Sequence, residues 1–222
     1  DLFAKELRSA MRMIIWFSLP IAMLMFFCRG YIVSIIDRGG NGTIAMLLGI
    51  FCLAIFLRSV FHIMSRSFYA FQDTKTPLLV SLVTLAVSVG LEIWLVFGWH
   101  MGAGGIAWAQ VIWALLELTS LTVLILRRVP NLFDSEFWHK ISRMLIACGV
   151  MSVVTYLMVQ RINLKFENQN MIMVLIPLAV IGTVSILVYL GVSRLLRIEE
   201  AEPIITKLGR IVSGRFMLGK DK

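Results

Sequence analysis

The sequence predicts an all-α, polytopic membrane protein, a bundle of about six transmembrane helices. Hydrophobic residues make up 59% of the 222 residues and charged residues 15%, and the mean hydropathy is +0.88. This composition is too apolar for a water-soluble domain. The apolar residues gather in six runs of about 18 to 23 residues, long enough at about 1.5 Å per residue to cross a hydrocarbon layer of about 30 Å.

The first run, 11–28, holds one charge, Arg12, and an internal proline, Pro20. A proline at membrane depth kinks a helix by removing one backbone hydrogen bond, which neighbouring helices can satisfy again. The other predicted helices are 43–65, 77–97, 105–126, 141–159 and 171–190. The linkers carry turn residues and lie at 37–43, 72–77, 100–105, 129–136 and 163–170. None is long enough to form a soluble domain.

Positive charge is distributed unequally between the two ends of these helices. Of the 21 Lys and Arg residues, the predicted topology places Arg58 within the membrane, sixteen on one side and only four on the other, Arg29, Arg38, Arg161 and Lys165. Because Lys and Arg accumulate on the cytoplasmic side, both ends of the chain are predicted to be cytoplasmic. We expect no nucleic acid partner, because these cations flank apolar runs and do not form one solvated face interleaved with aromatic residues.

The sequence changes character after the sixth run. Glu199, Glu200 and Glu202 precede Pro203, which is a helix start signal. Apolar residues then recur at helical spacing, with Lys207 and Arg210 on another face. Two interpretations stay open, an interfacial amphipathic helix and a disordered basic tail. The chain lacks an initiator Met and a signal peptide, and we expect it to be the C-terminal part of a longer protein.

Four ionisable side chains are predicted at membrane depth, where each costs about 2.5 to 3.5 kcal/mol on insertion scales: Arg58, His62, Glu92 and Glu117. Arg58, His62 and Arg66 repeat at i, i+4 and i+8, so one helix face carries a basic stripe that Tyr69 approximately continues. This stripe predicts the wall of a polar cavity that receives an anionic headgroup. In the alternative, Arg66 marks the cytoplasmic interface, Arg58 extends towards it and His62 packs at the interface.

The two acidic residues allow several roles. Glu92 and Glu117 are candidates for cation or proton sites, or for partners of basic groups across the bundle. Glu117 lies near the middle of its segment, which favours a structural or coupling pair, whereas Glu92 lies towards the outer end, where it can reach water. The cysteines lie singly in apolar segments, which argues against a disulfide framework and a metal site. We therefore predict no catalytic residue, no metal and no cofactor.

The stretch RSFYAFQDTKTP, 66–77, resembles the FYA-x-x-D-T-x-T-P signature of the MurJ/MviN lipid II flippases. It lies at a predicted cytoplasmic turn and includes Phe68, Tyr69, Asp73, Thr74, Lys75, Thr76 and Pro77. Two weaker features agree: the internal Ser18-Leu19-Pro20, and GAGGIAWAQ at 102–110. The latter is similar to a G-x-x-G-x-A-x-A turn of the wider MOP superfamily, whose small residues allow close helix packing. By motif the resemblance covers about residues 5 to 126.

The resemblance implies the C-terminal portion of a fourteen-helix flippase of the bacterial cytoplasmic membrane. Residues 1–126 would be four helices of its second lobe, 127–197 two terminal helices, and 198–222 a cytoplasmic amphipathic tail. The first lobe, which carries the family's essential arginines, is absent from this chain. The implied activity is export of a lipid-linked peptidoglycan precursor by alternating access, without covalent chemistry. The implied partners are this precursor, membrane lipids and the missing lobe.

The same resemblance implies how the substrate is held. Its pyrophosphate needs cations, which points to Arg58 and His62, and its polyprenyl tail needs an apolar groove, which the last two predicted helices would form. One alternative is a polysaccharide-repeat flippase or a drug antiporter of the same superfamily. Others are a non-transporting membrane scaffold subunit, and a membrane enzyme acting on lipid. The enzyme would need an interfacial cluster of His, Asp or Glu, which His100 and His139, at opposite interfaces, do not form.

Overall fold

The computed structural model describes residues 2–37, 41–129, 132–162 and 171–202. The helices in these ranges are α1 (Leu2–Phe27), α2 (Arg29–Ile36), α3 (Gly42–Ala70), α4 (Lys75–Ile93), α5 (Ala103–Arg128), α6 (Ser135–Arg161) and α7 (Met171–Leu195), with a π-helical turn η1 (Trp94–Gly98) and a 3-10 turn η2 (Glu199–Ala201). Six are long and apolar enough to cross a membrane: α1, α3, α4 continued by η1, α5, α6 and α7. The predicted fold class is confirmed. The predicted tail helix lies outside the described residues.

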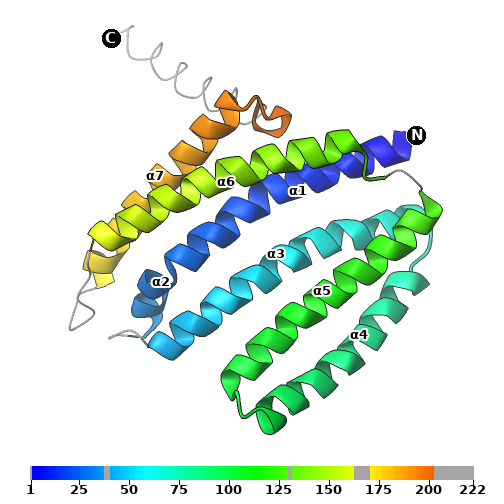
Figure 1. The fold of residues 1–222 in the computed structure, drawn as a ribbon, viewed down its shortest axis with the longest axis horizontal. Coiled ribbons are helices and arrows are strands. Elements are labelled where there is room, and N and C mark those ends of the chain that lie inside the picture. The colour runs from blue at the N-terminus through cyan, green and yellow to red at the C-terminus, as the bar shows by residue number, and fades with distance from the viewer. Residues whose placement is uncertain (1, 38–40, 130–131, 163–170, 203–222) are drawn as a thin grey trace, which may run out of the picture.

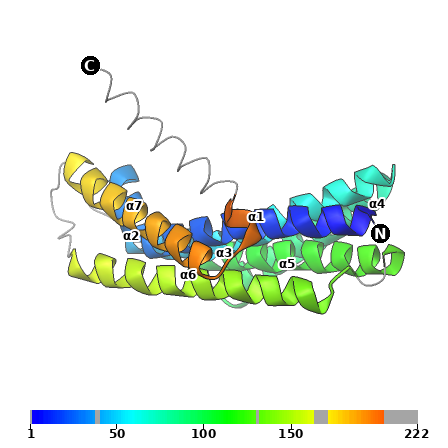
Figure 2. The same ribbon diagram turned by 90° about the horizontal axis from the view of Figure 1, so that it is seen from above.

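The six long helices form a curved layer in the order α4, α5, α3, α1, α6, α7 (Figure 1). The short helix α2 continues α1 beyond Cys28 and lies beside α7, on the same side of α6 (Figure 2). Within the most apolar stretch of α4, only 17% of the residues are buried, and the highest value for any span is 33%. The layer therefore leaves most of its apolar surface available to lipid or to another part of the protein.

The proline in α1 shows how this layer satisfies its backbone. Pro20 has no N–H, so the carbonyl of Trp16, four residues earlier, loses its helical donor. The buried hydroxyl of Tyr189 in α7 donates to this carbonyl at 2.9 Å. In return the Trp16 indole N–H donates to the Ser193 hydroxyl at 3.3 Å. A neighbouring helix thus replaces the lost bond, as predicted for a proline at this depth.

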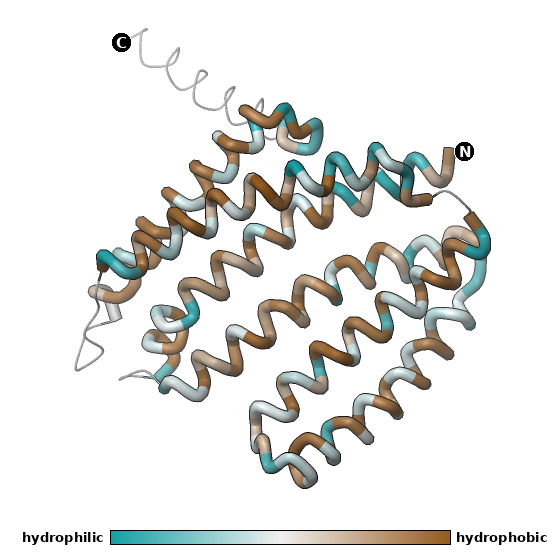
Figure 3. The backbone as a smooth tube through the Cα atoms, in the orientation of Figure 1, coloured by the Kyte–Doolittle hydropathy of each residue, from teal (hydrophilic) through white to brown (hydrophobic). Residues whose placement is uncertain are grey.

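Hydrophilic residues gather at the helix ends and apolar residues along their length (Figure 3). At the basic end, which we define as the start of α1, the α3–α4 turn, the end of α5, the start of α6 and the end of α7, ion pairs join distant parts of the chain. They are Arg8–Asp134, Arg12–Glu200 at 2.6 Å and Lys140–Glu199 at 2.8 Å. Up to residue 202, the structure therefore groups charges that the predicted topology places on one side.

Hydrogen bonds among a few residues hold the α3–α4 turn together. Gln72 adopts a left-handed φ of 57°, and the N–H of Asp73 bonds back to the Phe68 carbonyl at 3.0 Å, which closes the end of α3. The Asp73 carboxylate then accepts from the Thr76 N–H at 3.0 Å and the Thr76 hydroxyl at 2.7 Å, and it pairs with Arg128 of α5. One side chain thus caps α4 and connects it to α5.

Glycine permits close contact between α5 and the end of the preceding span. A Cβ added to Gly105 would lie 3.1 Å from the Leu95 carbonyl carbon and 3.2 Å from its oxygen. Backbone atoms cannot move aside as a flexible side chain does, so a larger residue here must separate the two helices. This close approach is the packing role predicted for the small residues of 102–109.

We expect Gly105→Ala to lower the free energy of unfolding by about 1 to 3 kcal/mol, because the methyl group overlaps the Leu95 backbone. Thermal unfolding in detergent measures the effect. Gly149→Ala is the matched control, because a Cβ there meets nothing within 4 Å. An equal loss of stability in both variants would contradict the proposed contact.

We also expect Asp73→Ala to reduce the amount of folded protein in the membrane, since α4 loses its cap and its link to α5. Hydrogen bonds from the Thr76 N–H and hydroxyl, and then from Arg128, lower the pKa of Asp73 from 3.8 to about 2. The stabilisation is therefore complete above pH 3.8 and is lost as the pH falls towards 2. The difference in melting temperature between wild type and Asp73→Asn should narrow over this range. If the difference in melting temperature does not change with pH, the charged cap is contradicted. If Asp73→Ala reaches normal abundance but loses transport completely, Asp73 is a functional residue.

Candidate functional site

The basic stripe of α3 divides into two environments. His62, Arg66 and Tyr69 are exposed on one face of α3, whereas Arg58 is half-buried against α5. The reason is geometric, because a step of four residues overshoots a helical turn by about 40° and two steps by about 80°. Arg58 therefore lies towards the neighbouring helix, and Arg66 towards the open face.

Two side chains of α5 hold Arg58. The guanidinium carbon lies 4.0 Å from the centroid of the Trp113 ring, a distance at which a cation is attracted to the ring face. One guanidinium N–H group donates to the Gln110 side-chain oxygen at 3.3 Å. In the part of the chain that the structure describes, Arg58 has no direct carboxylate partner. It is a cation near the middle of α3, and its remaining donors meet no acceptor among the described residues.

Glu92 of α4 completes this arrangement. Its Oε1 accepts from the Gln110 side-chain amide at 2.9 Å and from the Ser88 hydroxyl at 3.4 Å. A second connection runs from the Trp113 indole N–H to the Thr84 hydroxyl at 3.2 Å. We call the whole set, contributed by three helices, the interior polar network: Arg58, Thr84, Ser88, Glu92, Gln110 and Trp113. Arg58 and Glu92 are thus brought together through an amide.

The structure does not bring Glu117 into this network. Its side chain is 3% exposed on α5, and no ion pair reaches it from any described residue. The described helices therefore supply no ion-pair partner for Glu117, and the structural or coupling role of Glu117 stays a prediction. His62 likewise has no hydrogen bond to Arg58 or Glu92 in the described ranges.

The residues of the sequence motif occupy the α3–α4 turn at the basic end. Phe68 is fully buried, and the Arg128 guanidinium lies 5.2 Å from its ring centroid. Pro77 is also buried, in the first turn of α4, while Thr74 and Lys75 are exposed. The motif therefore combines a packed aromatic residue with the Asp73–Thr76 cap, an arrangement that supports a structural role for this turn.

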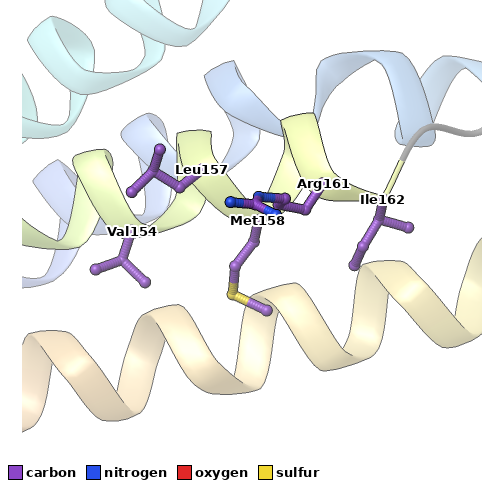
Figure 4. A pocket seen from close by; sticks show the side chains of 5 residues that line it. All are labelled: Val154, Leu157, Met158, Arg161 and Ile162. Carbon is purple, nitrogen blue, oxygen red and sulfur yellow. The ribbon is translucent and has the colours of Figure 1, made fainter.

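A pocket of about 290 Å³ lies on the side of α6 near its last residues, lined by Val154, Leu157, Met158, Arg161 and Ile162. Met158 extends towards α7 (Figure 4). Met158 and Ile162 also pack against the small core that α7 forms with Cys28 and Tyr31. Four of the lining residues are apolar and the fifth is the exposed Arg161, so the pocket suits an apolar chain with an anionic group near it.

The sequence-based candidates omitted Gln110, Trp113, Thr84 and Ser88. A signal existed for Thr84 and Ser88, since Thr84, Ser88 and Glu92 repeat at i, i+4 and i+8 within an apolar run, as Arg58, His62 and Arg66 do. Polar side chains recurring on one face of a membrane helix indicate a face turned towards other protein groups. The spacing does not reveal which helix that face meets.

Comparisons with known proteins agree with the motif. The family model described as "Lipid II flippase MurJ" matches residues 1–177. A probable lipid II flippase MurJ of Thermotoga maritima is 32% identical over 114 residues, which are 51% of this chain and 22% of that protein. One of Rhizobium tropici is 26% identical over 151 residues, 65% of this chain and 28% of that protein. The chain thus matches less than a third of the length of these relatives. With a family model that covers most of its residues and a six-span helical fold, this multi-pass membrane protein belongs to the MurJ lipid II flippase family.

Proposed function

We propose that the chain is the C-terminal part of a lipid II flippase of the bacterial cytoplasmic membrane. Its helices would line one side of the path along which a lipid-linked peptidoglycan precursor crosses the bilayer. The observation that carries this proposal is Arg58, a cation on a membrane-spanning helix that gives one hydrogen bond to Gln110 and whose other donors have no partner in the described part of the chain. An anion that travels through the bilayer needs such a group, because hydrocarbon provides no compensating charge.

The chemistry of the precursor fits this position. A pyrophosphate presents several acceptor oxygens, and the planar guanidinium of Arg binds phosphate oxygens in pairs. His62 and Arg66 lie further along α3, exposed between Arg58 and the basic end. A headgroup that enters from that end would thus meet the cation of Arg66 and the imidazole of His62 before it reaches Arg58.

The apolar part of the substrate requires a different surface. We assign the polyprenyl chain to the side of α6 that faces α7, where the pocket around Met158 is apolar. Thr155 and Ser185 satisfy one another at 2.7 Å between these two helices, so the neighbouring surface presents few unpaired polar groups to a hydrocarbon chain. Headgroup and tail would thus contact different parts of the layer.

Alternating access requires a second body against which this layer can move. The single layer of helices, with most of its apolar surface uncovered, supports a first lobe of the same protein as that body. In this proposal α1 to α5 belong to the second lobe and α6 and α7 are the terminal pair. Arg12 and Lys140 would fix η2, which follows α7, to α1 and α6 through their ion pairs.

The basic end should face the cytoplasm, because Lys and Arg are retained there during insertion. A topology reporter placed in the 72–77 turn, and another fused after Lys222, should both report a cytoplasmic position. A reporter at Gly40 should report the outside. An external signal from the 72–77 turn would refute this orientation.

Arg58→Ala should reduce lipid II flipping by the full-length protein by at least about tenfold while membrane insertion continues, because a hydrogen bond to a charged group is worth about 1.5 to 3 kcal/mol. Arg58→Lys should restore part of the activity if charge matters more than the planar fork. The measurement is flipping in reconstituted vesicles. Arg127→Ala is the control, since Arg127 is an exposed cation at the basic end.

Access to position 58 gives a second measurement. A cysteine introduced by Arg58→Cys should react with a small water-soluble thiol reagent, whereas the native Cys28, Cys52 and Cys148 are buried at 1% to 3% exposure. If that cysteine is protected in both access states and Arg58→Ala flips lipid II at the wild-type rate, Arg58 is a structural residue.

A further inference from the structure

We propose that Gln110 and Glu92 are positioning residues. Glu92 supplies a counter-charge for Arg58 inside the membrane, and Gln110 holds the guanidinium through one donor, so that its other donors stay free to bind an anion. The inference rests on the proposed function, in which Arg58 contacts the substrate pyrophosphate. It concerns how that cation is held. Arg58, Gln110 and Glu92 come from α3, α5 and α4, so the arrangement depends on all three helices.

The two charged groups dictate the orientation of the amide between them. A guanidinium can only donate hydrogen bonds and a carboxylate can only accept them. The Gln110 oxygen must therefore face Arg58 and its NH2 group must face Glu92, as observed at 3.3 Å and 2.9 Å. In the flipped amide, donor would face donor and acceptor would face acceptor. Glu92 thus aligns the acceptor that holds Arg58.

The arginines at the basic end are paired differently from Arg58. Arg8, Arg12 and Arg128 each contact a carboxylate directly. A direct carboxylate can occupy two donors of a guanidinium in a bidentate pair. At Arg58 an amide takes the place of the carboxylate and uses one donor only. The negative charge of Glu92 remains near enough to act on Arg58 through the polarised amide, while the other donors stay available.

The remaining contacts fix the plane of the guanidinium. Trp113 covers its face at 4.0 Å, and the indole is itself held by Thr84 at 3.2 Å. Ser88, which is 1% exposed, donates to Glu92 on the far side of the network. Face and edge of the guanidinium are therefore both supported, and an incoming anion would meet a group that is already oriented.

The first test measures charge compensation by thermal unfolding of the full-length protein and does not depend on substrate. Glu92→Gln should lower the melting temperature because Arg58 loses its counter-charge, and Arg58→Ala should lower it because Glu92 then remains charged alone. The double variant Arg58→Ala with Glu92→Gln removes both charges, so it should be more stable than the less stable of the two single variants. If the double variant loses the sum of the two single losses, the charge link between Glu92 and Arg58 is refuted.

The second test measures lipid II flipping against lipid II concentration in vesicles. Gln110→Glu places a carboxylate directly on Arg58 and occupies its donors, so the apparent KM should rise about tenfold or more with a smaller change in maximal rate. Glu92→Gln should also raise the apparent KM, because a partner that can both donate and accept no longer forces one orientation of the Gln110 amide. Gln160→Leu is the matched control, since Gln160 is an exposed glutamine of α6 bonded only to Tyr156 among described residues.

The results separate the two proposals. If Arg58→Ala leaves flipping unchanged, the proposed function of Arg58 fails and the positioning role fails with it. If Arg58→Ala abolishes flipping but Gln110→Glu and Glu92→Gln keep the wild-type KM, only the positioning role is overturned. A raised KM in both variants, with the wild-type KM kept by Gln160→Leu, supports the proposal, because a merely structural role would lower stability and the amount of active protein without changing KM.

Discussion

Hydrocarbon cannot donate or accept a hydrogen bond, so a polar group within this bundle that its own helix cannot satisfy is stabilised by a partner from another helix. Because Pro20 has no N–H, the Trp16 carbonyl lacks its helical donor, and the Tyr189 hydroxyl of α7 donates to it instead. Near the opposite end of the bundle, the Tyr31 hydroxyl donates to the Ile162 carbonyl at 2.8 Å, where α6 ends. These contacts connect helices far apart in sequence at the points where a single helix cannot satisfy itself. The same requirement explains why the packing of α7 against α1 is specific although both are largely apolar.

Charged side chains also need partners, and the kind of partner differs with depth in the membrane. At the basic end, where water and headgroups are close, cations pair directly with carboxylates and tie the ends of α1, α6 and α7 together. Deeper, Arg58 is compensated through Gln110 and supported by an aromatic ring. A directly paired cation stabilises a helix end, whereas one compensated through an amide retains capacity to bind. The division matches the proposed roles of the two regions, fixed packing at the end and anion binding inside.

Close packing makes the interior polar network possible. Glu92 and Gln110 meet because the end of the α4 span and the start of α5 approach at Gly105, where there is no room for a Cβ. At the other end of the same pair of helices, Asp73 binds Arg128. The two contacts fix how α4 lies along α5, and α5 in turn presents Gln110 and Trp113 to α3. Asp73 of the sequence motif and Gly105 thus act together on the position of Arg58, although neither residue touches it.

The sequence by itself determined the fold class, the six spans and the family, because the thickness of the bilayer sets the length of an apolar run and the motif is a local pattern. It also identified Pro20, Arg58 and Glu92 as unusual groups at membrane depth. Only the tertiary structure decided their partners. The sequence places Glu92 towards the outer end of its helix, where it can reach water, and the structure adds its contacts with Gln110 and Ser88. Arg58 and Arg66 share a stripe in the sequence and differ in burial. Helical spacing gives the face of a residue to within a few tens of degrees, whereas the partner across an interface depends on the rotation and crossing of two helices, which are set by side-chain packing along their whole length.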